Sequence, residues 1–237
     1  MYSYYHILGS NSRFVYYILF WLLMMFAQWR VRANFRRWSG VRSTCRMTGS
    51  QVARRILEAN NLDHMVNVEY VAGYLSDHYD PTTRVVRLSE EVHDSNSVAA
   101  IAIAAHECGH ALQHQATYKS LVLRHKLVPV CNIASGLAPL LLFAGLIFSS
   151  FNLLLVGVIF FSLAVLFHLV TLPVEFDASK RARKVLYSLG LAGTFDQKGI
   201  NKVLYAAAFT YVVAALVSVT ELMHYLGLLV GVSGRDD

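Results

Sequence analysis

The sequence predicts a mainly α-helical membrane protein with about four transmembrane helices and a small cytoplasmic α+β core. Hydrophobic residues make up 55% of the 237-residue chain and charged residues only 15%, whereas soluble chains average about 25% charged residues. Four apolar segments also approach the length of about 20 residues that a helix needs to cross the hydrocarbon core. These segments are residues 14–29, 128–148, 153–172 and 203–230.

The first apolar segment, residues 14–29, carries Trp21 and Trp29 where they can anchor a helix at the membrane interfaces. A secretory signal peptide would begin with positive charge and end at a small-residue cleavage site. This segment has little positive charge before its apolar core and no such site after it. We therefore expect residues 1–29 to be a retained transmembrane anchor.

The second and third apolar segments predict a two-helix transmembrane hairpin over residues 128–172, in which Pro139 kinks the first helix. The connection at residues 149–152 carries no charge. We expect a further helix over residues 173–202 on the cytoplasmic side. A C-terminal transmembrane helix and tail are expected over residues 203–237.

Positive charges indicate the orientation of the chain, because loops rich in Lys and Arg stay in the cytoplasm. Two basic clusters follow the first and third spans: Arg30, Arg32, Arg36, Arg37, Arg42 and Arg46, then Lys180, Arg181, Arg183, Lys184, Lys198 and Lys202. We therefore expect segments 30–127 and 173–202 to be cytoplasmic, with the N-terminus and the 149–152 turn outside a bacterial-type plasma membrane. The net charge of +6 then reflects topology and contact with anionic head groups, and indicates no nucleic-acid partner.

The cytoplasmic segment before residue 98 predicts one helix and two strands. Thr48 or Ser50 can cap the helix. Period-two alternation over residues 65–71 and 84–88 predicts the strands, and residues 76–83 between them read as a polar loop. A strand near an active site could pair with an extended peptide.

Residues 106–110 read His-Glu-Cys-Gly-His, the pattern H-E-x-x-H. On a helix, positions i and i+4 share a face, so His106 and His110 can bind one metal ion. Glu107 can hold and deprotonate a water bound to that ion. A buried helix whose histidines are satisfied by protein neighbours is the alternative, but two imidazoles and a carboxyl group are costly to bury without partners.

The sequence around this pattern predicts a helix too short to span a membrane. Ser95 or Ser97 can cap it, and only residues 98–105 are continuously apolar. Cys108 lies two positions after the first histidine and points away from the metal face, so we expect it to pack in the core. Cys108, Cys45 and Cys131 form no C-x-x-C pattern, which predicts a reducing compartment without a disulfide framework.

A catalytic zinc site usually has three protein ligands and an open position for water. His114 lies about 80° around a straight helix and two turns along from the first histidine, out of reach of a shared ion. Glu221 lies inside the fourth predicted span. Glu175 follows the third span on the cytoplasmic side and is the best third ligand, although an acid at a helix N-terminus also has a structural explanation.

A dense polar group, residues 77–80, lies in the predicted loop. It can be a structural turn held by side-chain to backbone bonds. Alternatively, Asp77 or Asp80 could accept the second N–H of a zinc-bound histidine, and His78 or Tyr79 could donate to the oxyanion. The sequence leaves these roles open.

Three segments together resemble the YugP-like neutral zinc metallopeptidases of membranes: Ser-Asp-His-Tyr-Asp-Pro at 76–81, Ala-Ala-His-Glu-x-Gly-His-Ala-x-Gln at 104–113, and Thr-Leu-Pro-Val-Glu-Phe-Asp-Ala-Ser at 171–179. The likeness extends over residues 48–225. It implies a gluzincin-like metalloprotease core, formed by the 30–127 segment and the third-ligand helix at 173–202. It also implies a Zn²⁺ cofactor, and the residues expected as its ligands and general base are His106, His110, Glu175 and Glu107.

The run from Glu175 to Ala178 also resembles the third-ligand motif E-[FY]-x-A-D of HtpX-type membrane gluzincins. Ser179 stands where those proteins have an aspartate that contacts a zinc-bound histidine. Residues that could support the histidines or the oxyanion are therefore Asp77, His78, Tyr79, Asp80, Asp177 and Ser179.

The sequence thus predicts a membrane-embedded zinc endopeptidase acting at the cytoplasmic face on membrane-associated or unfolded polypeptides, in an oligomeric state left open. A non-catalytic zinc-binding scaffold is an alternative, but it would need no base and would usually close the fourth position with Cys or His. A site-2-type intramembrane protease would place its H-E-x-x-H in a spanning helix. A metal transporter would carry more polar residues in its spans than Asn132 and His168.

Overall fold

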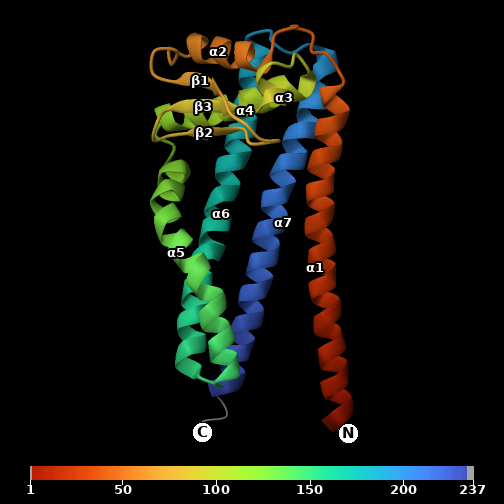
Figure 1. The fold of residues 1–237 in the computed structure, drawn as a ribbon, viewed down its shortest axis with the longest axis vertical. Helices are drawn as coiled ribbons and strands as arrows, with labels where there is room; N and C mark the ends of the chain where they lie inside the picture. The colour runs from red at the N-terminus through yellow and green to blue at the C-terminus, as the bar shows by residue number, and fades with distance from the viewer. Residues whose placement is uncertain (1, 234–237) are drawn as a thin grey trace.

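The computed structural model describes residues 2–233, which form seven helices and a three-stranded sheet. Four long helices run side by side along the molecule, and the short elements gather at one end (Figure 1). The long helices are α1 (Tyr2–Ser39), α5 (Lys119–Ile147), α6 (Phe151–Ser188) and α7 (Thr194–Ser233). The start of α1 and the α5–α6 turn both lie at the end opposite the sheet.

Within the described residues, three helices are long and apolar enough to cross a membrane: α5, α6 and the Thr194–Gly231 part of α7. These three correspond to the second, third and fourth predicted spans, although α5 ends one residue before the end predicted for the second. The first predicted span, residues 14–29, lies within α1, which is not among the three, so its role as a span stays a prediction.

The hairpin helices extend beyond the predicted hydrophobic segments. α5 begins at Lys119 and continues through Pro129 and Pro139. α6 continues through Pro173 to Ser188, so the third predicted span and the first part of the helix expected over residues 173–202 are one element. This continuity means that residues after the apolar part of α6 are rigidly connected to the hairpin. The rest of that expectation is wrong, because the chain turns at residues 189–193, where Gly190 has a positive φ, and residues 194–202 begin α7.

The short elements form an α+β layer over the cytoplasmic ends expected for the long helices. Its members are α2 (Gly49–Ala59), β1 (Asn67–Tyr70), β2 (His78–Asp80), β3 (Val85–Leu88), α3 (Glu90–His93) and α4 (Val98–Gln115). The strand order is β1-β3-β2, in which β1 is parallel and β2 is antiparallel to β3. β1 and β3 confirm the two predicted strands.

β2 corrects the prediction of a loop throughout residues 76–83. Tyr79 pairs with Val86, and Asp80 pairs with Val85 and forms a 3.0 Å ion pair with Arg87. A three-residue strand has no periodicity of its own to detect. Its pairing with β3 stabilises it, and that pairing is visible only in the folded chain.

The caps of α2 and α4 were predicted as alternatives, and the structure selects one residue at each. Thr48 caps α2 in a reciprocal arrangement with Gln51. Ser97 caps α4, and its hydroxyl accepts a hydrogen bond of 3.1 Å from the Ala100 amide. These caps fix where the two main helices of the α+β layer begin.

α4 is the central helix of the α+β layer and is buried along most of its length between α2, the sheet, α6 and α7. Its small residues allow this close packing. A Cβ atom added at Gly109 would lie only 2.6 Å from the carbonyl oxygen of Ala178 in α6. This backbone contact sets the separation of α4 and α6 at the site described below.

Candidate metal centre

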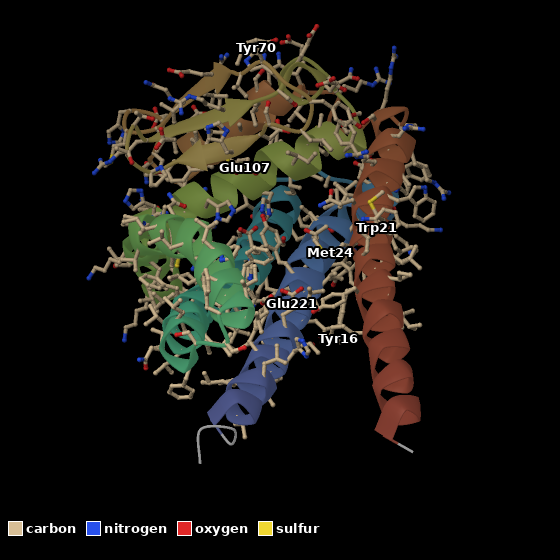
Figure 2. All side chains as sticks on the ribbon, turned by 60° about the horizontal axis from the view of Figure 1, so that its bottom comes forward. Tyr16, Trp21, Met24, Tyr70, Glu107 and Glu221 are labelled. Carbon is tan, nitrogen blue, oxygen red and sulfur yellow. The ribbon has the colours of Figure 1, made fainter. Side chains whose placement is uncertain are left out.

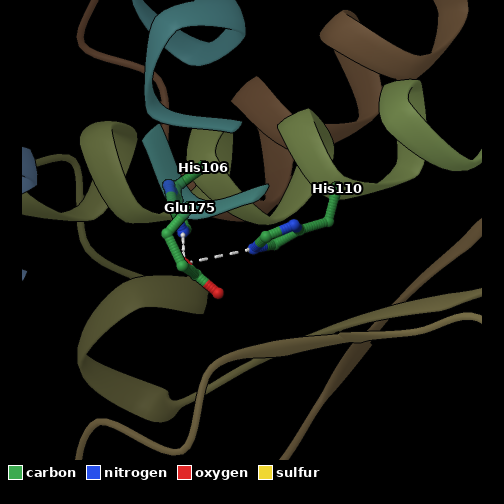
Figure 3. A group of neighbouring side chains, drawn as sticks. All are labelled: His106, His110 and Glu175. Atoms are coloured by element: carbon green, nitrogen blue, oxygen red, sulfur yellow. Dashed lines mark hydrogen bonds and ion pairs between the residues drawn. The ribbon is translucent and has the colours of Figure 1, made fainter. Parts of the chain in front are cut away.

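Two helices bring together His106 and His110 of α4 and Glu175 of α6 (Figure 3). Glu175 Oε2 lies 3.2 Å from His106 Nε2 and 3.6 Å from His110 Nε2. One ligand atom from each residue falls within 4.8 Å of the others. Over the residues whose side chains the structure describes, this is the one group of three or more His, Cys, Asp or Glu side chains with such spacing.

Each histidine has a hydrogen-bond partner on its other ring nitrogen. Ser179 Oγ lies 3.2 Å from His106 Nδ1. Gln113 Oε1 lies 3.0 Å from His110 Nδ1. Contacts at Nδ1 orient the two rings and leave each Nε2 directed toward the Glu175 carboxylate, which is the arrangement that metal-binding histidines commonly have.

The orientation of the Gln113 amide follows from its donors. Gln113 Nε2 donates to the carbonyl oxygen of Val174 at 2.8 Å and to Asp177 Oδ2 at 2.9 Å. Gln113 Oε1 is therefore the acceptor for His110, which fixes the proton of His110 on Nδ1. Arg181 Nε donates to the same Asp177 oxygen at 2.6 Å, so a chain of polar contacts supports His110.

These contacts show which of the residues predicted to support the histidines do contact them. Ser179 contacts a histidine directly, and Asp177 acts through Gln113. Asp77 and Asp80 contact neither histidine: Asp77 accepts from the Ser89 amide at 2.7 Å, and Asp80 binds Thr83 and Arg87. The aspartates of the 77–80 group therefore hold the strand region together.

The two other polar residues of that group differ in exposure. His78 is exposed, and its Nδ1 lies 2.8 Å from the Ser76 carbonyl oxygen. Tyr79 Oη lies 2.8 Å from Nδ1 of His114. His114 therefore has a partner of its own and lies outside the three-residue cluster, as helix geometry predicts.

A cavity of about 590 Å³ opens beside the cluster. Its walls come from the β2 region, α4, α5, α6 and α7, and the charged or titratable lining residues are Asp77, His78, Tyr79, His106, Glu107, His110, His114, Arg124, His125, Glu175 and Tyr211. Glu107 is only 8% exposed yet reaches this cavity. The space is therefore bounded by the cluster, a buried carboxyl group and an edge strand.

Asp77 and Glu107 bring two carboxyl groups to the same cavity. Burial raises the pKa of Asp77 to about 6, hydrogen bonds from Ser89 oppose this rise, and the nearby Glu107 charge adds to it. Asp80 differs, because hydrogen bonds from Thr83 and Arg87 lower its pKa. The environment thus separates two aspartates that the sequence pattern could not distinguish.

Cys108 takes no part in the cluster. Its side chain is fully buried, and its Sγ lies 3.7 Å from the carbonyl oxygen of Ala53 in α2. Burial raises the pKa of the Cys108 thiol, which favours the uncharged form. The prediction that this residue packs in the core is confirmed.

Three residues of the site were not predicted from the sequence. Gln113 lies three residues after His110 on the same helix, and that spacing could have indicated its contact. Arg124 Nη1 donates to Glu175 Oε1 at 3.1 Å, and Tyr211 of α7 lines the cavity. Neither has a local pattern that relates it to α4 or α6.

Glu221, which the sequence predicts inside a span, lies on α7 well away from Glu107 (Figure 2).

Comparisons with known proteins agree with this geometry. A family model described as "Putative neutral zinc metallopeptidase" matches residues 13–230. The chain is 52% identical over 215 residues to "Putative membrane protease YugP" of Bacillus subtilis (strain 168), and this alignment covers 91% of the chain and 94% of that protein. No solved structure matches the chain.

Proposed function

Because the chain belongs to the family described as "Putative neutral zinc metallopeptidase", we propose that it is a membrane-embedded zinc endopeptidase whose active site faces the cytoplasm. The observation that carries this proposal is the cluster of His106, His110 and Glu175 beside the buried carboxyl group of Glu107. A base is needed for hydrolysis and serves no purpose in a purely structural zinc site.

The donor set of the cluster suits zinc. Two imidazole nitrogens and one carboxylate oxygen are the usual protein ligands of a catalytic zinc site, and the adjoining cavity leaves room for water and substrate. In this proposal His106 and His110 bind through Nε2, and Glu175 binds through Oε2. Zinc bound there would act as a Lewis acid and lower the pKa of a bound water.

Glu107 is the general base of the proposed reaction. Its carboxylate accepts a proton from the attacking water and later donates it to the amine nitrogen of the leaving product. It lies one residue after His106 on α4, so the same helix carries the base and two of the ligands. Its low exposure keeps bulk water from competing for the proton.

An oxyanion develops on the scissile carbonyl as water adds, and a hydrogen-bond donor near it lowers the barrier. Of the two donors predicted from the sequence, Tyr79 is the better placed, because its hydroxyl is half-buried beside His114 and lines the cavity. The exposed His78 is less well held. Tyr211 of α7 also lines the cavity and is a further candidate donor.

An extended polypeptide is the substrate that best fits the cavity. β2 is an edge strand whose second side carries no partner strand in the described sheet, and its residues His78 and Tyr79 line the cavity. A peptide paired with β2 would lie alongside α4. Such pairing needs an unfolded segment, which supports membrane-associated or unfolded polypeptides as substrates.

The membrane position of the site is supported by the three apolar helices and by the charge distribution. We propose α1 as the fourth span. Its large apolar side chains are exposed along the part described, including Trp21 and Trp29 at 61% and 62%, and Trp21 and Met24 are labelled along α1 in Figure 2. Lipid would cover them. The basic segments 30–46 and 180–202 support a cytoplasmic orientation for the site.

The test combines metal analysis with peptide hydrolysis. Purified protein should contain zinc and cleave casein, and a chelator should abolish cleavage. Glu107→Gln should retain the metal and lower turnover by orders of magnitude, because the attacking water loses its proton acceptor. Glu91→Gln, which alters an exposed carboxyl group outside the cavity, is the matched control. Near-normal turnover by Glu107→Gln would exclude Glu107 as the base, and zinc binding without any cleavage would favour a structural site.

A further inference from the structure

The two oxygens of the Glu175 carboxylate have different partners. Oε2 faces the Nε2 atoms of His106 and His110 at 3.2 and 3.6 Å. Oε1 accepts a charge-assisted hydrogen bond of 3.1 Å from Arg124 Nη1. The carboxylate therefore has one oxygen on the histidine side and one oxygen engaged by a cation.

From this division of contacts, and building on the proposed function, we propose that Arg124 is a positioning residue of the metal centre. By holding Oε1, it presents Oε2 as the single carboxylate ligand and keeps Glu175 in the orientation that faces both histidines. Arg124 does not contact the metal in this arrangement. It acts on the metal only through the carboxylate that it holds.

Burial explains why such a residue is needed. Glu175 is 3% exposed, and a carboxylate removed from water requires compensating charge or hydrogen bonds. Among the described residues, Arg124 is the one Lys or Arg within ion-pair distance of Glu175. Its hydrogen bond to Oε1 therefore satisfies the buried oxygen that faces away from the histidines, and it holds the carboxylate in its present orientation.

The fold also explains how the pair is formed. Arg124 lies in the first turns of α5, before Pro129, and Glu175 lies in the second half of α6, just after Pro173. These helices are the two arms of the hairpin and pack against each other, and Figure 1 shows them diverging toward the sheet, where both line the cavity. The hairpin thus supplies both the third ligand and the residue that orients it, although 51 positions separate them in the sequence.

An ion pair could instead serve stability alone, and the two roles predict different measurements. A stabilising pair changes the unfolding temperature of metal-free protein and leaves metal affinity unchanged. A positioning residue changes metal affinity and the coordination geometry. Without Arg124, the freed Oε1 can also approach the metal, so the carboxylate would bind through both oxygens.

The experiment compares Arg124→Gln and Arg124→Lys with Lys126→Gln, an exposed cation two residues along the same helix without an ion-pair partner in the described structure. Zinc affinity is measured by competition with a chromophoric chelator, and coordination is measured by visible absorption of Co²⁺-substituted protein. Arg124→Gln should lower zinc affinity by about 10–100-fold and weaken the Co²⁺ bands, as expected for higher coordination. Arg124→Lys keeps the charge without the planar fork and should show a smaller loss, whereas Lys126→Gln should match the wild type.

Wild-type zinc affinity and an unchanged Co²⁺ spectrum in folded Arg124→Gln would overturn the proposal, even if its unfolding temperature falls. Should that variant not fold, the same result in Arg124→Lys would overturn it. Failure of the proposed function is distinguishable, because it would appear as wild-type protein that binds no zinc, or that keeps zinc after Glu175→Ala.

Discussion

Gly109→Ala tests whether the close contact between α4 and α6 assembles the metal centre. Gly109 lies between the two histidines of the cluster, and an added Cβ would meet the Ala178 carbonyl oxygen at 2.6 Å. Ordinary contact begins at 3.4 Å, so the helices must separate by about 0.8 Å at this point. Ala178 lies three residues after Glu175, so the displacement acts directly on the third ligand.

The expected effect is larger on metal binding than on folding. Metal–ligand distances tolerate deviations of about 0.2 Å, well below the required separation, so zinc affinity should fall by at least about 10–100-fold. Overpacking lowers the free energy of unfolding by about 1–3 kcal/mol. The higher helix propensity of alanine offsets up to about 1 kcal/mol of this loss. The metal-free variant should therefore remain folded, with a modest loss of stability.

The assay measures zinc affinity by chelator competition and the stability of metal-free protein by thermal unfolding. Gly136→Ala in α5 is the control, because a Cβ there meets no atom within 4 Å. It should keep zinc affinity and gain up to about 1 kcal/mol of stability. Wild-type zinc affinity in Gly109→Ala would refute the reasoning that this backbone contact sets the ligand geometry.

Three further predictions follow from the site, from Asp77 and from the topology. Glu175→Ala should lose zinc, because two protein ligands remain, whereas Glu221→Ala should retain it; metal analysis showing full occupancy in Glu175→Ala would remove Glu175 from the ligand set. The pKa of Asp77 is raised from 3.8 to about 6 in the folded protein, so the folded state binds that proton more tightly than the unfolded state. The free energy of unfolding should therefore fall by up to about 3 kcal/mol as the pH rises from about 4 through 6. In unfolding measurements between pH 4 and 7, Asp77→Asn should remove this fall in stability. If the stability of the variant falls with pH in parallel with that of the wild type, the prediction is contradicted. A cysteine introduced in the 149–152 turn should react with an impermeant thiol reagent on intact cells. A cysteine that replaces Arg183 should react only after the cells are permeabilised. The reverse pattern would place the site on the outer face of the membrane.

Local patterns in the sequence were sufficient for much of the fold and for the centre of the site. The i, i+4 spacing of His106 and His110 needs only a helix, and Ser97 and the Ala-rich run that follows it indicate that helix. Hydropathy alone predicted the segments that became α5, α6 and α7. The exclusion of His114 followed from helix geometry, and its contact with Tyr79 agrees with it.

The remaining features depend on contacts between segments far apart in the chain. β2 is stabilised by β3 and has too few residues for a periodic pattern. Arg124 and Tyr211 reach the cavity because α5 and α7 pack around α6, and no local signal encodes that packing. Asp77 and Asp80 differ in pKa because one is buried and the other is bound to Arg87, which only the folded environment determines.

The connection between α4 and α6 has a consequence for biosynthesis. His110 and Glu175 are separated by α5 and most of α6, so a nascent chain has two of the three proposed ligands until the hairpin has folded and placed Glu175 beside α4. Before that moment the chain would lack the third ligand of the proposed zinc site. If the chain has the proposed peptidase activity, membrane insertion would be the step that completes its site, and newly made protein would be inactive until then.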